Sequence, residues 1–349
     1  MKEYRPDRHT VLGAIALANR APSVHNTQPW HWLLGTDSIH LMADPARRLP
    51  VTDPDGRDLL LSCGAALHHL RVALSALGWR TIVRRVPNPG DPTHLAVVEP
   101  VASTPSTKDM ALVAAISRRR TDRRRFSSWP VPAGHLDLMV RRAQAAGALL
   151  VPVTEPVTRR RLTRAIDRAE SCRQDDPAYA AELAVWSGLD RITQDGVLAA
   201  STPPARRTHG DTTMRTFAGG TLTEAVTGRG EHDGGQLLVL ATLADDLVSV
   251  LRAGEAASAA LLIATDVGLA TCPLSQALEI PGNRGFIRDK VLDGAACPHL
   301  ILRTGWVPTA APPPPQSPRR ATVDTVGYLP GVRRQASQVP SPRRASSGG

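Results

Sequence analysis

The sequence predicts an α+β protein made of two related lobes in one chain. Residues 64–78 and 254–268 share their length, an opening of small residues and a terminal glycine, which predicts two buried helices that end at glycine C-caps. After a loop, each is followed by a strand that begins with His-Leu, at residues 94–98 and 299–303. The matched order of helix, loop and strand favours an internal repeat, although two Ala/Leu-rich helices can also resemble each other by chance.

The remaining elements follow in chain order from apolar periodicity and turn residues. Asp58 lies near the start of the first long helix. The expected elements are an apolar helix at 11–18, a turn-rich surface loop at 44–56, a polar linker at 101–108, a helix at 110–119 and a strand at 148–153.

These elements divide the chain into two lobes and a tail. A chain of 349 residues that is 42% hydrophobic can bury one large core or two modest ones. We therefore predict a first lobe at 1–105 and a second at 106–322. Prolines and glycines break residues 172–231 into short pieces, a pattern typical of a functional lid or a disordered insert. The proline-rich stretch at 311–316 and the tail at 323–349 are expected to be extended and disordered.

The positive charge is confined to two short segments. The formal net charge is +10, and residues 118–125 and 311–349 carry +5 each, so the rest of the chain is neutral. Aromatic residues make up only 3% of the chain. A nucleic-acid surface needs a spread of positive charge and stacking groups, so we predict no nucleic-acid partner.

Cysteine usage and hydropathy indicate a cytoplasmic protein. The four cysteines lie far apart, with no Cys-x-x-Cys and no histidine pair at ligand spacing, so neither a disulfide framework nor a metal site is predicted. No run of about 18 apolar residues occurs, and the charged N-terminus is not followed by an apolar signal stretch. We therefore expect no membrane partner.

Residues 21–30 read Ala-Pro-Ser-Val-His-Asn-Thr-Gln-Pro-Trp and crowd hydrogen-bonding groups between two prolines. Both prolines fix φ and remove a backbone donor, so the segment ends the preceding helix and resists forming another. This pattern predicts a stiff loop that displays Ser23, His25, Asn26 and Gln28 to a ligand. The alternative is a capped helix start, with Ser23 or Asn26 as the cap and Trp30 in the core.

Residues 118–126 concentrate arginines around Thr121 and Asp122. Two arginine forks and a hydroxyl group can satisfy the oxygens of a phosphate with charge-assisted hydrogen bonds. The alternative is a solvated basic turn in which Asp122 bridges neighbouring arginines.

Both segments resemble the FMN-dependent nitroreductase family. Residues 22–30 are similar to its Pro-Ser-x-x-Asn-x-Gln-Pro-Trp segment, which lies against the flavin across a subunit interface. Arg119, Arg120, Thr121 and Arg123 are similar to the Arg-Arg-Ser-x-Arg element that holds the FMN phosphate and ribityl groups. The order of the two motifs is inverted relative to an ordinary member, and each predicted lobe keeps only one of them.

This inverted order resembles the Acg subfamily, over most of residues 5–322. The resemblance implies a nitroreductase-like fold in which one chain mimics an internal dimer and keeps one flavin site. A functional monomer follows from this arrangement, with a homodimer as the alternative.

Two further segments fit the flavin site on this resemblance. Residues 271–276 occupy the place where the family directs backbone amides to flavin N5 and O4, here near Ser275 and Gln276, although the family's Pro-x-Glu-Gly is missing. The alternative is a helix-ending loop. Arg319 and Arg320 match a C-terminal basic element that reaches the phosphate, against the alternative of an untethered basic tail.

The resemblance implies an FMN-binding oxidoreductase that uses NADH or NADPH to reduce a small nitro or quinone acceptor. Flavin N5 carries the chemistry, so no catalytic residue is expected from the protein. The alternative is a flavin-sequestering protein whose insert covers the site and prevents turnover. The expected cofactor-binding residues are Ser23, His25, Asn26, Gln28, Arg119, Arg120, Thr121, Arg123, Ser275, Gln276, Arg319 and Arg320.

Overall fold

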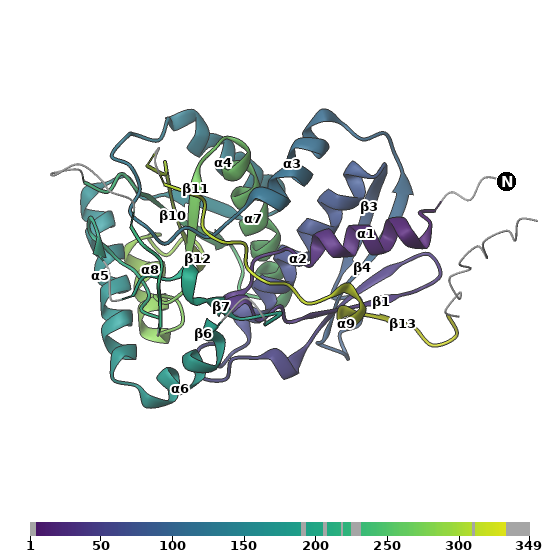
Figure 1. Ribbon diagram of the computed structural model, residues 1–349, viewed down its shortest axis with the longest axis horizontal. Helices are drawn as coiled ribbons and strands as arrows, with labels where there is room; N and C mark the ends of the chain where they lie inside the picture. The colour runs from purple at the N-terminus through teal and green to yellow at the C-terminus, as the bar shows by residue number, and fades with distance from the viewer. Residues whose placement is uncertain are drawn as a thin grey trace, which may run out of the picture.

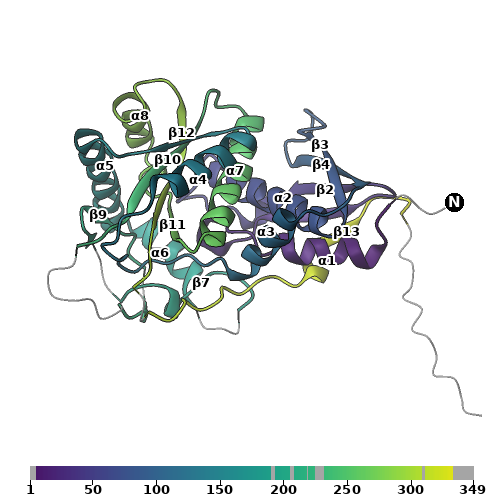
Figure 2. The same cartoon turned by 90° about the horizontal axis from the view of Figure 1, so that it is seen from above.

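Two β-sheets flank a central pair of long helices in the computed structural model (Figures 1 and 2). The structure describes residues 5–189, 193–204, 208–217, 219–224, 232–308 and 311–332. With 41% of residues in helices and 20% in strands, the predicted α+β class is confirmed.

The described residues form nine α-helices, among them the central pair. Capping groups stabilise the starts of several helices. Ser106 and Asp109 form a reciprocal capping box at α3 (Thr107–Arg118), and the Asp246 side chain accepts from Ser249 N at α7 (Leu247–Asp266). The α-helices are α1 (Arg8–Ala18), α2 (Arg57–Ala76), α3 (Thr107–Arg118), α4 (Ala133–Ala145), α5 (Pro156–Gln174), α6 (Pro177–Trp186), α7 (Leu247–Asp266), α8 (Pro281–Lys290) and α9 (Thr322–Thr325). Three short 3₁₀ helices are η1 (Val24–Asn26), η2 (Pro45–Arg47) and η3 (Ala199–Ser201).

The first sheet has the strand order β13-β1-β2-β4-β3, and the second has the order β11-β12-β10-β5. All pairs are antiparallel except β13 with β1. The first sheet contains β1 (Trp30–Leu34), β2 (Ile39–Ala43), β3 (Trp79–Arg85), β4 (His94–Ala102) and β13 (Val326–Tyr328). The second contains β5 (Leu149–Pro152), β10 (Gln236–Thr242), β11 (Ala270–Leu274) and β12 (Cys297–Gly305).

The predicted elements are present, with shifted ends. Both repeated helices are confirmed, but α2 and α7 begin earlier than predicted, at Arg57 and Leu247. Between α5 and β10, the described residues form α6 and four short strands: β6 (Ser187–Leu189), β7 (Val197–Leu198), β8 (Thr208–His209) and β9 (Thr212–Thr213). The division into two lobes at residue 105 stays a prediction. The helix α2 of the first predicted lobe and the helix α7 of the second pack directly against each other.

Two glycines set the distance between α2 and α7. A Cβ atom added to Gly64 would lie 2.2 Å from Leu251 O, and one added to Gly254 would lie 2.2 Å from Leu61 O. The backbones of the two helices therefore touch at this crossing. Both helices are long and apolar enough to span a membrane, with a mean hydropathy of 1.3 for α2 and 1.6 for α7. However, about three quarters of the apolar window of each helix is buried inside the protein. This burial is that of core helices.

The expectation that residues 323–349 are disordered is wrong for the described part of that segment. Val326–Tyr328 form β13, which extends the first sheet as a parallel edge strand beside β1. Asn19 explains this placement, since its amide donates to Thr325 Oγ1 at 2.8 Å and its Oδ1 accepts from the indoles of Trp30 and Trp32, both at 3.0 Å. Residues 333–349 lie outside the described residues.

We expect Gly64→Ala to lower the free energy of unfolding by about 1–3 kcal/mol or more, because the methyl group has no room between the two backbones. Gly13→Ala is the matched control: Gly13 lies inside α1 with nothing within 4 Å of an added Cβ, so this change should stabilise by roughly 0.4–1 kcal/mol. Urea unfolding of both variants measures the difference. Equal effects at the two positions would contradict the close helix crossing.

Candidate functional site

The loop between Pro22 and Pro29 has a strained and tightly bonded backbone. His25, Asn26 and Gln28 adopt positive φ values of 45°, 56° and 51°, which side chains other than glycine rarely take. The Ser23 hydroxyl group supports this shape by accepting from Gln28 N at 2.9 Å. The segment is thus a rigid loop, although its centre contains the single 3₁₀ turn η1.

The extended segment at 318–321 is tied to this loop. Arg319 donates to Asn26 Oδ1 at 2.8 Å and to Arg20 O at 3.0 Å. Arg320 donates its backbone N–H to Gln28 Oε1 at 2.9 Å and its guanidinium to Gln28 O at 3.1 Å. These bonds overturn the alternative of an untethered basic tail. In Figure 1 the longer yellow stretch that contains this segment crosses from the half with the second sheet to the half with the first.

Four arginines form what we call the basic cluster: Arg20, Arg119, Arg120 and Arg319. Within the described residues, none of them forms an ion pair with a carboxylate. Arg119 is only 6% exposed, and its Nε and Nη1 atoms have no hydrogen-bond partner. Burial and the neighbouring arginines lower the pKa of Arg119 to about 10 and that of Arg319 to about 9, so both remain charged at neutral pH.

The basic cluster contributes to one of two adjacent cavities. The two cavities share lining residues, among them Ser23, Thr121 and Arg123. The phosphate-side cavity is lined by Pro22, Ser23, His25, Asn26, Arg119, Thr121, Arg123, Val197, Ser201, Pro315, Ser317 and Arg319. No carboxylate is among these residues, so the chemistry of this wall suits an anion.

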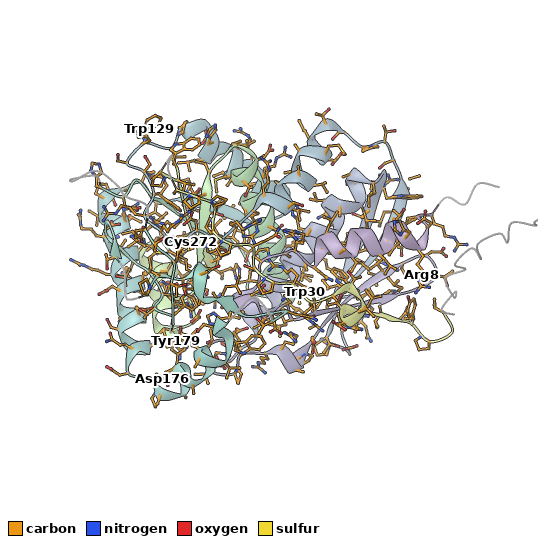
Figure 3. All side chains as sticks on the ribbon, viewed as in Figure 1. Arg8, Trp30, Trp129, Asp176, Tyr179 and Cys272 are labelled. Atoms are coloured by element: carbon orange, nitrogen blue, oxygen red, sulfur yellow. The ribbon has the colours of Figure 1, made fainter. Side chains whose placement is uncertain are left out.

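The second cavity, which we call the ring-side cavity, lies along the crossing of α2 and α7. Apolar side chains of both helices form one wall, among them Leu61, Ala65, Ala257 and Leu261. The other lining residues include members of the loop, of the insert, and of the end of β11 with the segment that follows it: Ser23, Val24, His25, Met214, Arg215, Phe217, Leu274, Ser275 and Gln276. Figure 3 shows Cys272, another lining residue, in the half that contains the second sheet, with Trp30 nearer the centre.

Arg215 connects the insert to the ring-side cavity, and no sequence motif pointed to it. Its guanidinium pairs with Glu279, and it also donates to Ser275 Oγ at 3.1 Å and to Tyr179 Oη. The side chains of Arg215 and Glu279 are 7% and 2% exposed. Arg215 lies in the weakly patterned region at 172–231, where no motif separated it from the other arginines.

His25 is held neutral at this site. Burial lowers its pKa well below the usual value, and the positive charges of Arg215 and Arg123 lower it further. Its ring meets Phe217 edge to face, with 6.0 Å between the centroids. His25 therefore offers a neutral imidazole to the cavity.

The structure brings most of the sequence-predicted residues to the two cavities, but not all. Arg120 belongs to the basic cluster but lines neither cavity. Asp122 forms an ion pair with Arg124, as expected if Asp122 bridges neighbouring arginines, but both residues are buried and the turn is therefore not solvated. Gln28 and Arg320 bond to each other away from the cavities. The predicted residues that line a cavity are Ser23, His25, Asn26, Arg119, Thr121, Arg123, Ser275, Gln276 and Arg319.

Comparison with known proteins finds relatives over nearly the whole chain. The chain is 42% identical over 335 residues to the "Putative NAD(P)H nitroreductase Rv3131" of Mycobacterium tuberculosis, and the match covers 96% of both chains. It is 37% identical over 320 residues to the "Putative NAD(P)H nitroreductase acg" of the same organism, covering 91% of this chain and 95% of the relative. No protein-family model matches the chain.

Among solved structures, the chain is similar to nitroreductases with bound FMN. The structure from Bacteroides fragilis is 14% identical, with a TM-score of 0.36 and coverage of 58% of this chain and 90% of that one. The structure from Desulfitobacterium hafniense is 12% identical, with a TM-score of 0.39 and coverage of 63% and 98%.

Glu279→Gln should destabilise the protein by about 3–5 kcal/mol, because it leaves the Arg215 charge buried without a counter-ion. Replacing both residues by methionine should recover most of that loss. Asp289→Asn is the control, since its pair with Arg288 is about half exposed on both sides, so its loss should leave stability nearly unchanged. Thermal and urea unfolding test the set; a neutral effect of Glu279→Gln would contradict the buried pair.

Proposed function

Because the chain belongs to the NAD(P)H nitroreductase family that includes Acg, we propose that it binds FMN and passes electrons from NADH or NADPH to a nitro or quinone acceptor. The acceptor is a small molecule, and the site of action is the cytoplasm. One chain supplies both motifs of the site, which supports a functional monomer.

The observation that carries this proposal is the basic cluster without a counter-ion. Burying several like charges is unfavourable unless an anion compensates them. Arg119 directs two unpartnered nitrogen atoms into the protein beside the phosphate-side cavity, and Arg319 approaches the cavity from the C-terminal segment. These donors fit a phosphate group, since arginine forks bind phosphate oxygens in pairs.

The other residues have supporting roles in the proposal. Thr121 and Arg123 line both cavities, so they would contact the group that joins phosphate and ring. Ser23, His25 and the segment at Ser275 and Gln276 would border the ring. FMN supplies the hydride chemistry when bound, and the protein supplies position and electrostatics. Gln28 and Arg320 support the site indirectly by holding the loop and the C-terminal segment together. Asn26 lines the phosphate-side cavity and also donates to Pro318 O of that segment.

A second candidate function is flavin sequestration with little nicotinamide-dependent turnover. The insert supports it, because Met214, Arg215 and Phe217 form a wall of the ring-side cavity. Arg215 is fixed there by Glu279, and Arg123 donates to Ser201 O at 3.0 Å. A nicotinamide would need this wall to move before it could stack on the flavin.

Arg119→Ala should weaken FMN binding by about 10- to 100-fold, because each lost hydrogen bond from a charged group is worth roughly 1.5–3 kcal/mol. Arg118→Ala is the control: its side chain is 56% exposed and pairs with Asp266, so FMN affinity should not change. Fluorescence titration of FMN measures both. The apoprotein with Arg119→Ala should be no less stable than the wild type, because a like charge has been removed. Unchanged FMN affinity would contradict the phosphate assignment.

The visible spectrum of the FMN-loaded protein separates the two candidate functions. Anaerobic addition of NADH or NADPH should bleach the flavin band within seconds if the protein is a reductase. Sequestration predicts that dithionite bleaches the band while both nicotinamides leave it unchanged. A protein that binds no FMN would overturn both candidates.

A further inference from the structure

Asp58 joins the ring-side cavity to another cavity that no part of the proposed site uses. It lies in the first turn of α2 and lines both spaces. We call the additional space the acidic cavity; it is lined by Thr52, Asp53, Pro54, Asp55, Arg57, Asp58, Leu278, Glu279, Arg284, Pro298 and His299. The Asp58 Oδ2 atom is buried, and no hydrogen-bond donor among the described residues reaches it.

The charged groups around Asp58 already have other partners. On the preceding loop, Asp53 accepts from Leu59 N at 2.8 Å, so backbone donors at the N-terminus of α2 oppose the rise in the pKa of Asp53 that burial causes. Arg57 pairs with Asp245 at 2.7 Å.

The segment after β11 and the insert face Asp58 with Glu279 and Arg215, which pair with each other. Of the three neighbouring carboxyl groups, Asp53 has backbone donors and Glu279 has a guanidinium. Asp58 Oδ2 has neither.

Protonation of Asp58 removes the negative charge that would otherwise be buried without a partner. Burial raises the pKa of Asp58 well above its usual value, and the nearby charges of Asp53 and Glu279 raise it further, against the smaller effects of Arg215 and Arg57. Carboxyl groups in contrasting environments commonly divide in this way, one charged and one neutral. A neutral Asp58 is a hydrogen-bond donor that faces the ring-side cavity.

We propose that Asp58 is the acid that protonates the acceptor, and that it regains its proton through the acidic cavity. This inference rests on the proposed function. When a quinone takes a hydride equivalent, which is two electrons and one proton, from the reduced flavin of the proposed function, it becomes a hydroquinone monoanion with one phenoxide oxygen. The Asp58 proton then forms the second O–H bond and leaves Asp58 as a carboxylate. A quinone is thereby reduced to a hydroquinone, and a proton from water restores the acid.

The acidic cavity provides a path for that return. Glu279 Oε2 is also buried without a partner, on a side chain that is 2% exposed. It lies in the same cavity as Asp58, and Asp55 marks the exposed side of that cavity. Polar groups at both ends fit a short relay between solvent and Asp58.

The first test measures the protonation of Asp58 without any cofactor. Infrared spectra of the apoprotein at neutral pH should contain a protonated-carboxyl band that Asp58→Asn removes and Asp55→Asn keeps. Loss of the same band intensity in both variants, or in neither, would overturn the assignment.

Stability gives an independent readout of the same state. The unfolded pKa is near 3.9, so a raised folded pKa means that wild-type stability falls as pH rises from about 4 to the folded value. Asp58→Asn cannot ionise, so its Tm should exceed that of the wild type by an amount that grows with pH over this range. A difference that does not vary with pH would indicate an ordinary ionised Asp58.

The second test follows the oxidation of the dithionite-reduced, FMN-loaded protein by 1,4-benzoquinone. Asp58→Asn should slow this reaction by roughly 10²- to 10⁴-fold, and its remaining rate should fall as pH rises, because solvent must supply the proton. The wild-type rate should not vary with pH below the folded pKa of Asp58. Identical rates and pH profiles would overturn the donor role, whereas failure of the wild type to bind FMN would overturn the proposed function and leave the infrared result unaffected.

Discussion

The direct contact between α2 and α7 is the constraint on which the rest of the structure depends. Gly64 and Gly254 remove the side chains that would separate the two backbones, and dispersion contacts between closely packed helices compensate for the missing apolar groups. Each helix also packs against one of the sheets, so the crossing fixes the position of the two sheets relative to each other. The ring-side cavity lies along this crossing, and apolar side chains of both helices form one of its walls.

Chain segments that are distant in sequence meet around this apolar wall of the ring-side cavity. The loop at residues 21–30 approaches from the first sheet, and the segment after β11 approaches from the second. The C-terminal segment crosses between them and ends in β13 (Figure 2). Its two arginines bond to the loop backbone and to Asn26 and Gln28, so their positions depend on the same hydrogen bonds that hold the strained loop. Binding groups and supporting groups are therefore parts of one network.

Charge is distributed unevenly around the cavities, and this asymmetry carries the chemistry. The phosphate-side cavity gathers guanidinium groups without carboxylates, whereas the acidic cavity gathers four carboxyl groups from the loop before α2, the start of α2 and the segment after β11. Buried charges are stable only with partners. One region therefore favours a bound anion, and the other favours a protonated carboxyl group. Both regions share lining residues with the ring-side cavity.

The sequence by itself determined the α+β class, the two core helices, the rigid loop between Pro22 and Pro29, and the arginine-rich segment. Each of these is a local property, because apolar periodicity, proline geometry and charge clustering are legible over a few residues. Tertiary structure decided that Gln28 and Arg320 bond to each other instead of lining a cavity, that the residues after Ala321 complete a sheet, and that Arg215 and Asp58 reach the ring-side cavity. No local pattern encodes those outcomes, because each depends on which distant groups compete for the same hydrogen bond or share the same buried space.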